Sequence, residues 1–218
     1  MDRLLDFILW TPLLGMLTVL LLPSAKKDLI RWASLIFTAI TFGLTVMLYM
    51  KFDNTLTGMQ NAFNVKVPWI SQFNIFYSLG VDGISLPMVM LTGLLFFLCI
   101  LSSWTIEKSV KSYFALFLML ECSVMGVFLS LDFFLFYVFW EVMLIPMFFL
   151  IGIWGGENRE YAAIKFFLYT FAGSVLMLVG MIALYFVSGQ SVDSFNILAL
   201  QGGQFSDLTL NVFGTTFS

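Results

Sequence analysis

Three ionisable side chains lie inside strongly apolar stretches of the sequence: Glu121, Glu141 and Lys165. A charge near the centre of a lipid bilayer costs at least about 2.5–3.5 kcal/mol, so such residues usually face protein or water. A carboxyl in that position can take up and release protons, which a relay needs. We therefore interpret Glu141 and Glu121 as candidate proton-relay residues. Lys165, with Tyr169 one helical turn further on, is a candidate cation at an internal water cavity.

Each of these residues also has a purely structural interpretation. Glu121 and Glu141 could simply hydrogen-bond to neighbouring helices, and Lys165 could extend its ammonium group to the membrane surface. Pro146 lacks an N–H and frees the carbonyl of Val142, the residue after Glu141. This predicts a helix kink and a hydrated spot beside the acid, although an ordinary packing kink would have the same sequence.

The helical rise gives the depth of each group. At about 1.5 Å per residue, Glu121 lies roughly 12 Å and Glu141 roughly 18 Å from the same membrane face. We therefore expect the two carboxyls to face one shared, partly hydrated interior, and one or both to hold a proton at pH 7. Lys165 lies roughly 15 Å from Glu141 in depth by the same rise, too far for a direct ion pair. Asp82 and Asp132 are predicted helix caps.

The composition is that of a membrane protein. The 218 residues are 61% hydrophobic and 11% charged, whereas soluble chains are about 25% charged. This excludes a soluble enzyme, a nucleic-acid binder and a secreted disulfide scaffold. There is no histidine, and we expect neither a metal site nor a bound cofactor. Cys99 and Cys122 lie in apolar runs and are interpreted as buried, structural thiols.

Apolar runs of about 20 residues match the roughly 30 Å hydrocarbon core of a bilayer. The sequence therefore predicts an all-α integral membrane protein with a six-helix transmembrane domain over residues 1–188. The helices are expected over residues 4–22, 29–50, 84–104, 113–131, 133–154 and 163–188.

The remaining segments connect or follow these helices. Residues 53–80 alternate apolar and polar side chains, which predicts a β-hairpin in an outer loop, with Pro68 on its edge. Residues 189–218 form a polar tail that we expect to lead to further helices, with a short interfacial helix near 195–200. Lys and Arg number six in one set of loops and three in the other, which favours an outer N-terminus.

Helices four to six contain a recognisable pattern. Gly126-Val127-Phe128-Leu129-Ser130-Leu131-Asp132 leads into Phe139-Trp140-Glu141-Val142-Met143-Leu144-Ile145-Pro146-Met147. Ile153-Trp154-Gly155-Gly156 and Lys165-Phe166-Phe167-Leu168-Tyr169-Thr170 follow, and Val81-Asp82-Gly83-Ile84-Ser85-Leu86 precedes helix three. The pattern resembles the subunit M family of bacterial NADH:quinone oxidoreductase, respiratory complex I, which is equivalent to mitochondrial subunit 4. The resemblance runs from residue 81 to 188 and is specific in its Trp-Glu-x-x-Leu-x-Pro core.

The resemblance implies an antiporter-like, proton-translocating membrane-arm subunit of the respiratory chain. Glu141 would belong to the family's central hydrophilic axis, with its partner lysine on a seventh helix. This chain would be the start of a fourteen-helix fold built of two inverted repeats. Such a subunit is not itself redox-active, because flavin and iron–sulfur clusters reside in other subunits and electrons reach quinone there.

The resemblance also implies partners and a location. The expected partners are other membrane-arm subunits, the remainder of its own fold and lipid, and the location is the bacterial inner membrane with a periplasmic N-terminus. Two alternatives are a subunit of a multi-subunit sodium/proton antiporter, which shares the fold, and a structural scaffold without transport of its own. The hairpin and the residues around Glu141 favour complex I.

Overall fold

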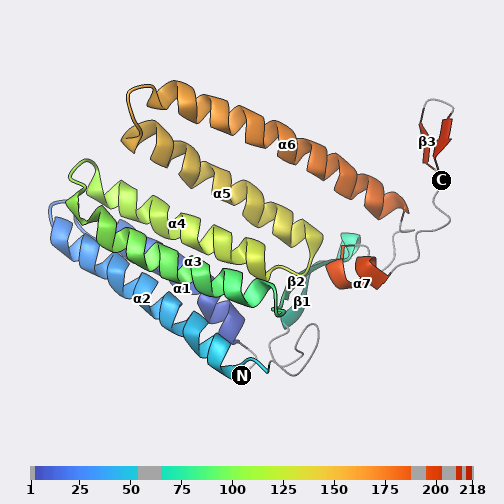
Figure 1. Cartoon of the computed structure of the whole chain (residues 1–218), viewed down its shortest axis with the longest axis horizontal. Coiled ribbons are helices and arrows are strands. Elements are labelled where there is room, and N and C mark those ends of the chain that lie inside the picture. Colours follow the sequence, from blue (N-terminus) through green and yellow to red (C-terminus); the bar gives the residue numbers. More distant parts are fainter. Residues whose placement is uncertain (1–2, 54–64, 188–194, 203–209, 213–214, 218) are drawn as a thin grey trace.

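The computed structural model describes residues 3–53, 65–187, 195–202, 210–212 and 215–217. Six of its helices are long and apolar enough to cross a membrane, which confirms the prediction of a multi-pass, all-α fold. Figure 1 shows them side by side. They are α1 (Leu4–Leu21), α2 (Lys27–Lys51), α3 (Ser85–Ser102), α4 (Val110–Leu129), α5 (Phe133–Trp154) and α6 (Arg159–Val187).

Three helices begin earlier than the apolar runs indicate. α2 begins at Lys27, α4 at Val110 and α6 at Arg159. The predicted first residues are 29, 113 and 163. Hydropathy marks only the lipid-facing length, whereas a helix also extends through polar residues into the headgroup region. α4 ends at Leu129, two residues before the expected end, because the following residues form a bridge to the hairpin.

α4 is the central helix of the bundle. It packs against α1, α2, α3 and α5, whereas α6 packs against α5 (Figure 1). Two glycines allow close approach elsewhere in the bundle. A Cβ on Gly15 of α1 would clash with Phe37 of α2, and a Cβ on Gly93 of α3 would lie 3.1 Å from Thr45 Oγ1.

The strand pair lies at one end of the bundle, which we call the hairpin end. β1 (Val65–Ile70) pairs antiparallel with β2 (Ile75–Leu79), as predicted, and η2 (Ser71–Phe73) forms the connection. The pairing is irregular between Pro68 and Ile70, where proline cannot donate to the ladder. The opposite end, which carries η3 (Ser103–Thr105) and the α1–α2 and α5–α6 connections, is called the far end.

The α4–α5 connection extends this small sheet. Leu131 N donates to Ser78 O (2.8 Å), and Gly80 N donates to Leu129 O (2.9 Å). On the other side, Phe133 N donates to Phe195 O (2.7 Å). The hairpin is therefore bonded through backbone to the start of α5.

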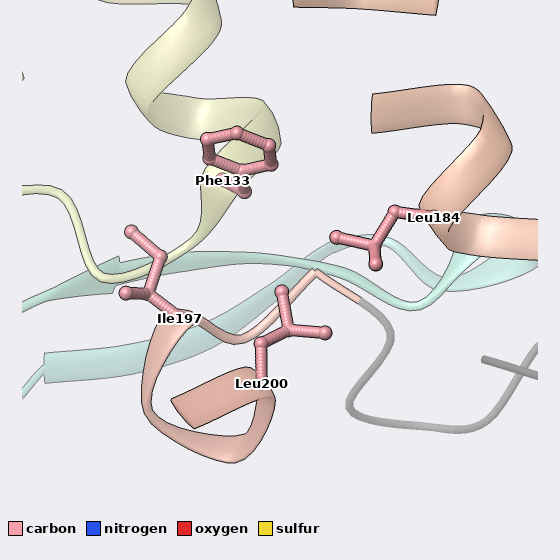
Figure 2. Close-up of a pocket in the computed structure, with 4 residues that line it drawn as sticks. All are labelled: Phe133, Leu184, Ile197 and Leu200. Carbon is pink, nitrogen blue, oxygen red and sulfur yellow. The ribbon is translucent and has the colours of Figure 1, made fainter. Parts of the chain in front are cut away.

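Part of the expected polar tail is helical. The predicted short helix is α7 (Ile197–Gly202), and β3 (Leu210–Val212) and β4 (Thr215–Phe217) form a second strand pair. Ile197 and Leu200 of α7 line an apolar hollow with Phe133 and Leu184 (Figure 2). α7 is thus placed against the hairpin ends of α5 and α6. Residues 188–194, the start of the tail, lie outside the described residues.

Of the three apolar clusters among the described residues, one joins Ile75, Met181 and Phe195 beside the hairpin, and the other two lie inside the bundle. The hairpin-end cluster contains Leu5, Ile8, Leu9, Leu48, Phe52, Leu79, Val81, Leu86, Val89, Cys122, Met125, Leu129, Leu135 and Phe139. The far-end cluster contains Val19, Ile30, Ile100, Val110, Phe114, Ala115 and Leu118.

Candidate functional site

Glu141 lies half-buried on α5, at its contact with α6. Phe148 of α5 and Phe167 of α6 have ring centroids 5.6 Å apart, and continuing this antiparallel register brings Glu141 level with Ser174. Tyr137, one turn before Glu141, interacts through its hydroxyl with both the Glu141 carboxyl and the Ser174 hydroxyl. Among the described residues, Glu141 Oε1 is buried and has no hydrogen-bond partner. This oxygen can therefore still form a hydrogen bond.

α5 runs from Phe133 to Trp154 without interruption, although Pro146 lies inside it. Proline leaves the carbonyl of Val142 without its usual helical partner. This carbonyl is next to Glu141 in the sequence. The kink and the hydration expected at Pro146 stay predictions.

Glu121 lies in a different environment. Its side chain is fully buried (0% exposed), and neither carboxyl oxygen has a hydrogen-bond partner among the described residues. At 100° per residue, it shares a face of α4 with Phe114, Leu118 and Met125. These neighbours belong to the two apolar clusters. Glu121 therefore points into the bundle formed with α1, α2 and α3.

The two carboxyls lie on opposite sides of the α4–α5 contact. Phe139 of α5 packs directly on Gly126 of α4; by helical geometry Glu121 is about 140° from Gly126, and Glu141 about 160° from Phe139. The same register leaves the two acids only about 4.5 Å apart in depth. Their similar depth was predictable, but the shared interior expected from the sequence is wrong, because depth does not determine the face of a helix.

Lys165 is exposed on α6. Its Nζ lies 5.6 Å from the ring centre of Tyr161 and 5.9 Å from that of Tyr169. The α5–α6 register separates it from Glu141 by about 13 Å in depth, so the two do not pair directly, as the sequence indicates. The structure thus places Lys165 with two tyrosines, apart from both acids.

The far end contains an ion cluster that sequence reasoning missed. Arg31, only 7% exposed, donates to Asp28 (2.9 Å), to Glu107 (2.7 Å) and to the carbonyl of Ile106 (2.9 Å). Lys27 also donates to Glu107. These bonds from Lys27 and then Arg31 lower the pKa of Glu107. The cluster ties the start of α2 to the α3–α4 connection, and a pairing 76 residues apart leaves no local sequence signal.

Both predicted caps accept backbone hydrogen bonds. Asp132 accepts from Phe134 N (2.9 Å) and Leu135 N (3.2 Å), and additionally from Phe76 N of β2 (3.0 Å). Burial raises the pKa of Asp132 despite these bonds. Asp82 accepts from Ile84 N and from Ser85 N (2.7 Å). Burial opposes ionisation there too, but the bonds from Ser85 and Ile84 outweigh it and lower the pKa of Asp82.

The cysteines differ from each other. Cys122 is buried, but Cys99 is exposed on α3, so the expectation of two buried thiols is wrong for Cys99. An apolar run in a membrane helix includes the lipid-facing side as well as the packed side. Within the described residues, no group of three or more His, Cys, Asp or Glu side chains could hold a metal ion.

Comparisons with known proteins find clear relatives. Residues 130–217 match the family described as NADH:quinone oxidoreductase/Mrp antiporter, TM. The chain is 46% identical over 194 residues to NADH-quinone oxidoreductase subunit M of Rhodobacter capsulatus, covering 87% of this chain and 37% of the relative. It is 37% identical over 180 residues to the F(420)H(2) dehydrogenase subunit M of Methanosarcina mazei, covering 81% and 36%. The chain thus spans little more than a third of these relatives.

Solved structures are similar in fold. Respiratory complex I from Thermus thermophilus with bound NADH contains a chain with a TM-score of 0.77 and 26% identity, covering 91% of this chain and 39% of that one. The Mrp complex from Dietzia sp. contains one with a TM-score of 0.66 and 18% identity, covering 84% and 20%. The second likeness concerns the fold alone.

Proposed function

Because the chain shares its sequence and fold with the antiporter-like subunit M family of NADH:quinone oxidoreductases, we propose that it serves proton translocation in such a complex. It would be part of a membrane-arm subunit that couples quinone reduction elsewhere in the complex to proton movement. The chain spans 37% of its relative from Rhodobacter capsulatus, so we assign this activity to the assembled complex and no catalysis to these residues alone.

The observation that carries the proposal is the state of the Glu141 carboxyl. It lies within a membrane-spanning helix, and its buried Oε1 has no partner among the described residues. Such a group is costly unless a proton, a cation or water satisfies it. Tyr137 and Ser174 beside it, and the freed carbonyl before Pro146, can bind water or pass a proton. We assign Glu141 the central role in the relay.

We assign two further residues to proton movement. Lys165, flanked by the rings of Tyr161 and Tyr169, offers a cation at the far-end half of α6. Its separation from Glu141 requires intermediate water or side chains from elsewhere in the protein. Glu121, on the other side of α4, would take up and release a proton separately from the α5–α6 contact.

The chain would take no part in electron transfer. We propose that flavin and iron–sulfur groups belong to other subunits, and that this chain itself holds no cofactor. Its partners would be neighbouring membrane-arm subunits, the rest of its own fold and lipid. We place it in the bacterial inner membrane with the hairpin end and the N-terminus on the periplasmic side, following the excess of Lys and Arg in the far-end connections.

Two other functions compete with this one. A multi-subunit sodium/proton antiporter would use the same fold, as the Dietzia sp. likeness illustrates, but at 18% identity against 46% for subunit M. A scaffold without transport would need no buried, unsatisfied carboxyl. Purification of the full-length protein from native membranes under mild conditions tests the choice. We expect co-purifying subunits that contain flavin and iron–sulfur clusters, whereas partners without redox groups would support the antiporter.

A further inference from the structure

A polar layer separates the two apolar clusters inside the α1–α4 bundle. On α2, Ile30 belongs to the far-end cluster and Leu48 to the hairpin-end cluster. The inward-facing residues between them are hydroxyl-bearing, and all are fully buried: Ser34, Thr38, Thr41 and Thr45. The spacing of three and four residues places them on one face of the helix.

The layer continues on α3 and α4. Thr92 of α3 is 6% exposed, and Gly93 beside it brings α3 close to Thr45 of α2. On α4, Glu121 lies between Leu118 of the far-end cluster and Met125 of the hairpin-end cluster. We define the polar layer as Thr41, Thr45, Thr92 and Glu121.

The register places Thr45, Thr92 and Glu121 at a similar depth, and Thr41 lies one turn from Thr45 toward the far end. Phe96 of α3 and Phe117 of α4 have ring centroids 5.0 Å apart, and continuing this antiparallel pairing brings Glu121 level with Thr92. A Cβ on Gly93, next to Thr92, would lie 3.1 Å from Thr45 Oγ1, which brings Thr45 to about the level of Thr92 and therefore of Glu121. A helical side chain leans toward its N-terminus, so the carboxyl approaches the level of Thr41.

Each of the three threonine hydroxyls already donates its proton to a backbone carbonyl of its own helix. Thr41 donates to Phe37 O (3.0 Å), Thr45 to Phe42 O (2.7 Å) and Thr92 to Met88 O (2.8 Å). A hydroxyl has one proton and two acceptor lone pairs, so each oxygen can only accept a further bond. An ionised carboxylate also only accepts. The layer therefore has no donor left for an ionised Glu121 carboxylate, which would be buried without a partner.

Other ionisable groups of the four helices do not supply that donor. Arg31 lies at the far end, bonded to Asp28 and Glu107. Asp6 of α1 accepts from the Tyr77 hydroxyl of the hairpin (2.8 Å). The buried thiol of Cys122, adjacent in sequence, belongs to the hairpin-end cluster. Among the described residues, no donor reaches either oxygen of Glu121.

We propose that Glu121 is a proton-holding site separate from Glu141, and that its buried carboxyl keeps its proton because the polar layer offers neither a donor nor a cation to the ionised form. The site lies in the α1–α4 bundle, on the opposite side of the α4–α5 contact from Glu141. The inference goes beyond the proposed function, because it concerns the protonation of one residue whether or not the complex pumps.

Infrared spectroscopy of the full-length protein in lipid at pH 7, in H₂O and in D₂O, tests this site. A protonated carboxyl has a carbonyl stretch that a carboxylate lacks. Glu121→Gln should remove one such band from the spectrum, and Glu141→Gln should leave that band in place. An unchanged protonated-carboxyl region in Glu121→Gln would overturn the proposal.

Threonine variants keep Glu121 and test its surroundings. Thr41→Val, Thr45→Val and Thr92→Val preserve side-chain shape, and at least one of them should shift the Glu121 band by removing a hydroxyl dipole near the carboxyl. Thr170→Val is the matched control, because the Thr170 hydroxyl donates to Phe166 O in the same way but lies on α6. A band that stays unshifted in all three variants would show that the polar layer does not surround the Glu121 carboxyl. If Glu121→Gln does not fold, the threonine variants still test whether the band belongs to Glu121.

Discussion

The ring of Phe139 in α5 packs so closely on Gly126 in α4 that a side chain at position 126 would overlap it. This contact sets the register of the two helices, and by helical geometry Glu121 and Glu141 both face away from it. Each acid therefore has its own environment, one among α1–α4 and the other at α6.

Substitution of Gly126 tests the contact. Gly126→Ala should destabilise the protein, since overpacking typically costs about 1–3 kcal/mol, and should lower the melting temperature in detergent. Gly43→Ala is the control, because a Cβ at Gly43 meets nothing within 4 Å. Equal melting temperatures for the two variants would show that Phe139 moves aside without cost.

The sequence predicts those features that depend on local pattern. Length and hydropathy give six spanning helices, alternation gives the hairpin, and position before a helix makes Asp132 a cap. Relationships between distant segments are not predictable in this way. The Arg31–Glu107 pair joins residues 76 apart, and the environments of Glu121 and Glu141 depend on how three helices turn about their axes. Residue type was enough to identify Glu121 and Glu141 as candidates. Only the packing of the helices shows that the two acids lie in different environments.

The far-end ion cluster should make stability depend on pH. Lys27 and Arg31 lower the pKa of Glu107, so the cluster stabilises the fold above the ordinary value of 4.5 and loses this effect as pH falls through the lowered value. The melting temperature of the wild type should therefore fall more between pH 6 and pH 3 than that of Glu107→Gln.

At pH 7, Glu107→Gln should melt below the wild type, and the difference should shrink with acidification. Glu157→Gln, at an exposed glutamate of the same end, is the control and should follow the wild type. Parallel curves for Glu107→Gln and the wild type would mean that the cluster contributes nothing.

Asp132 should hold the hairpin to α5. Asp132→Ala leaves three backbone donors without their acceptor, including Phe76 N in β2. Loss of a cap alone costs about 0.5–2 kcal/mol, and trypsin should in addition cut faster after Lys66 in β1. Asp82→Ala, which removes bonds only to Ile84 and Ser85, should leave this cleavage rate unchanged. Equal rates for both variants would contradict the link.

The proposed topology predicts which end is accessible from outside the cell. In a background with Cys99→Ser and Cys122→Ser, a Gln72→Cys variant should react with an impermeant thiol reagent added to intact cells. A Lys26→Cys variant should react only after the membrane is permeabilised. Both positions are exposed in the structure, so the reverse labelling pattern would place the hairpin end inside.

The central claim is that the Glu141 carboxyl must titrate for protons to move. Glu141→Gln keeps the shape of the side chain but cannot ionise, whereas Glu141→Asp keeps the carboxyl and shortens its reach. The direct measurement is NADH-driven proton uptake into inverted membrane vesicles containing the full-length protein, beside NADH oxidation with an artificial acceptor, which reports assembly alone. Glu141→Gln should assemble normally and lose pumping by about tenfold or more, while Glu141→Asp retains part of it. Full pumping by Glu141→Gln with normal assembly would contradict the account and leave Glu141 as a contact between helices.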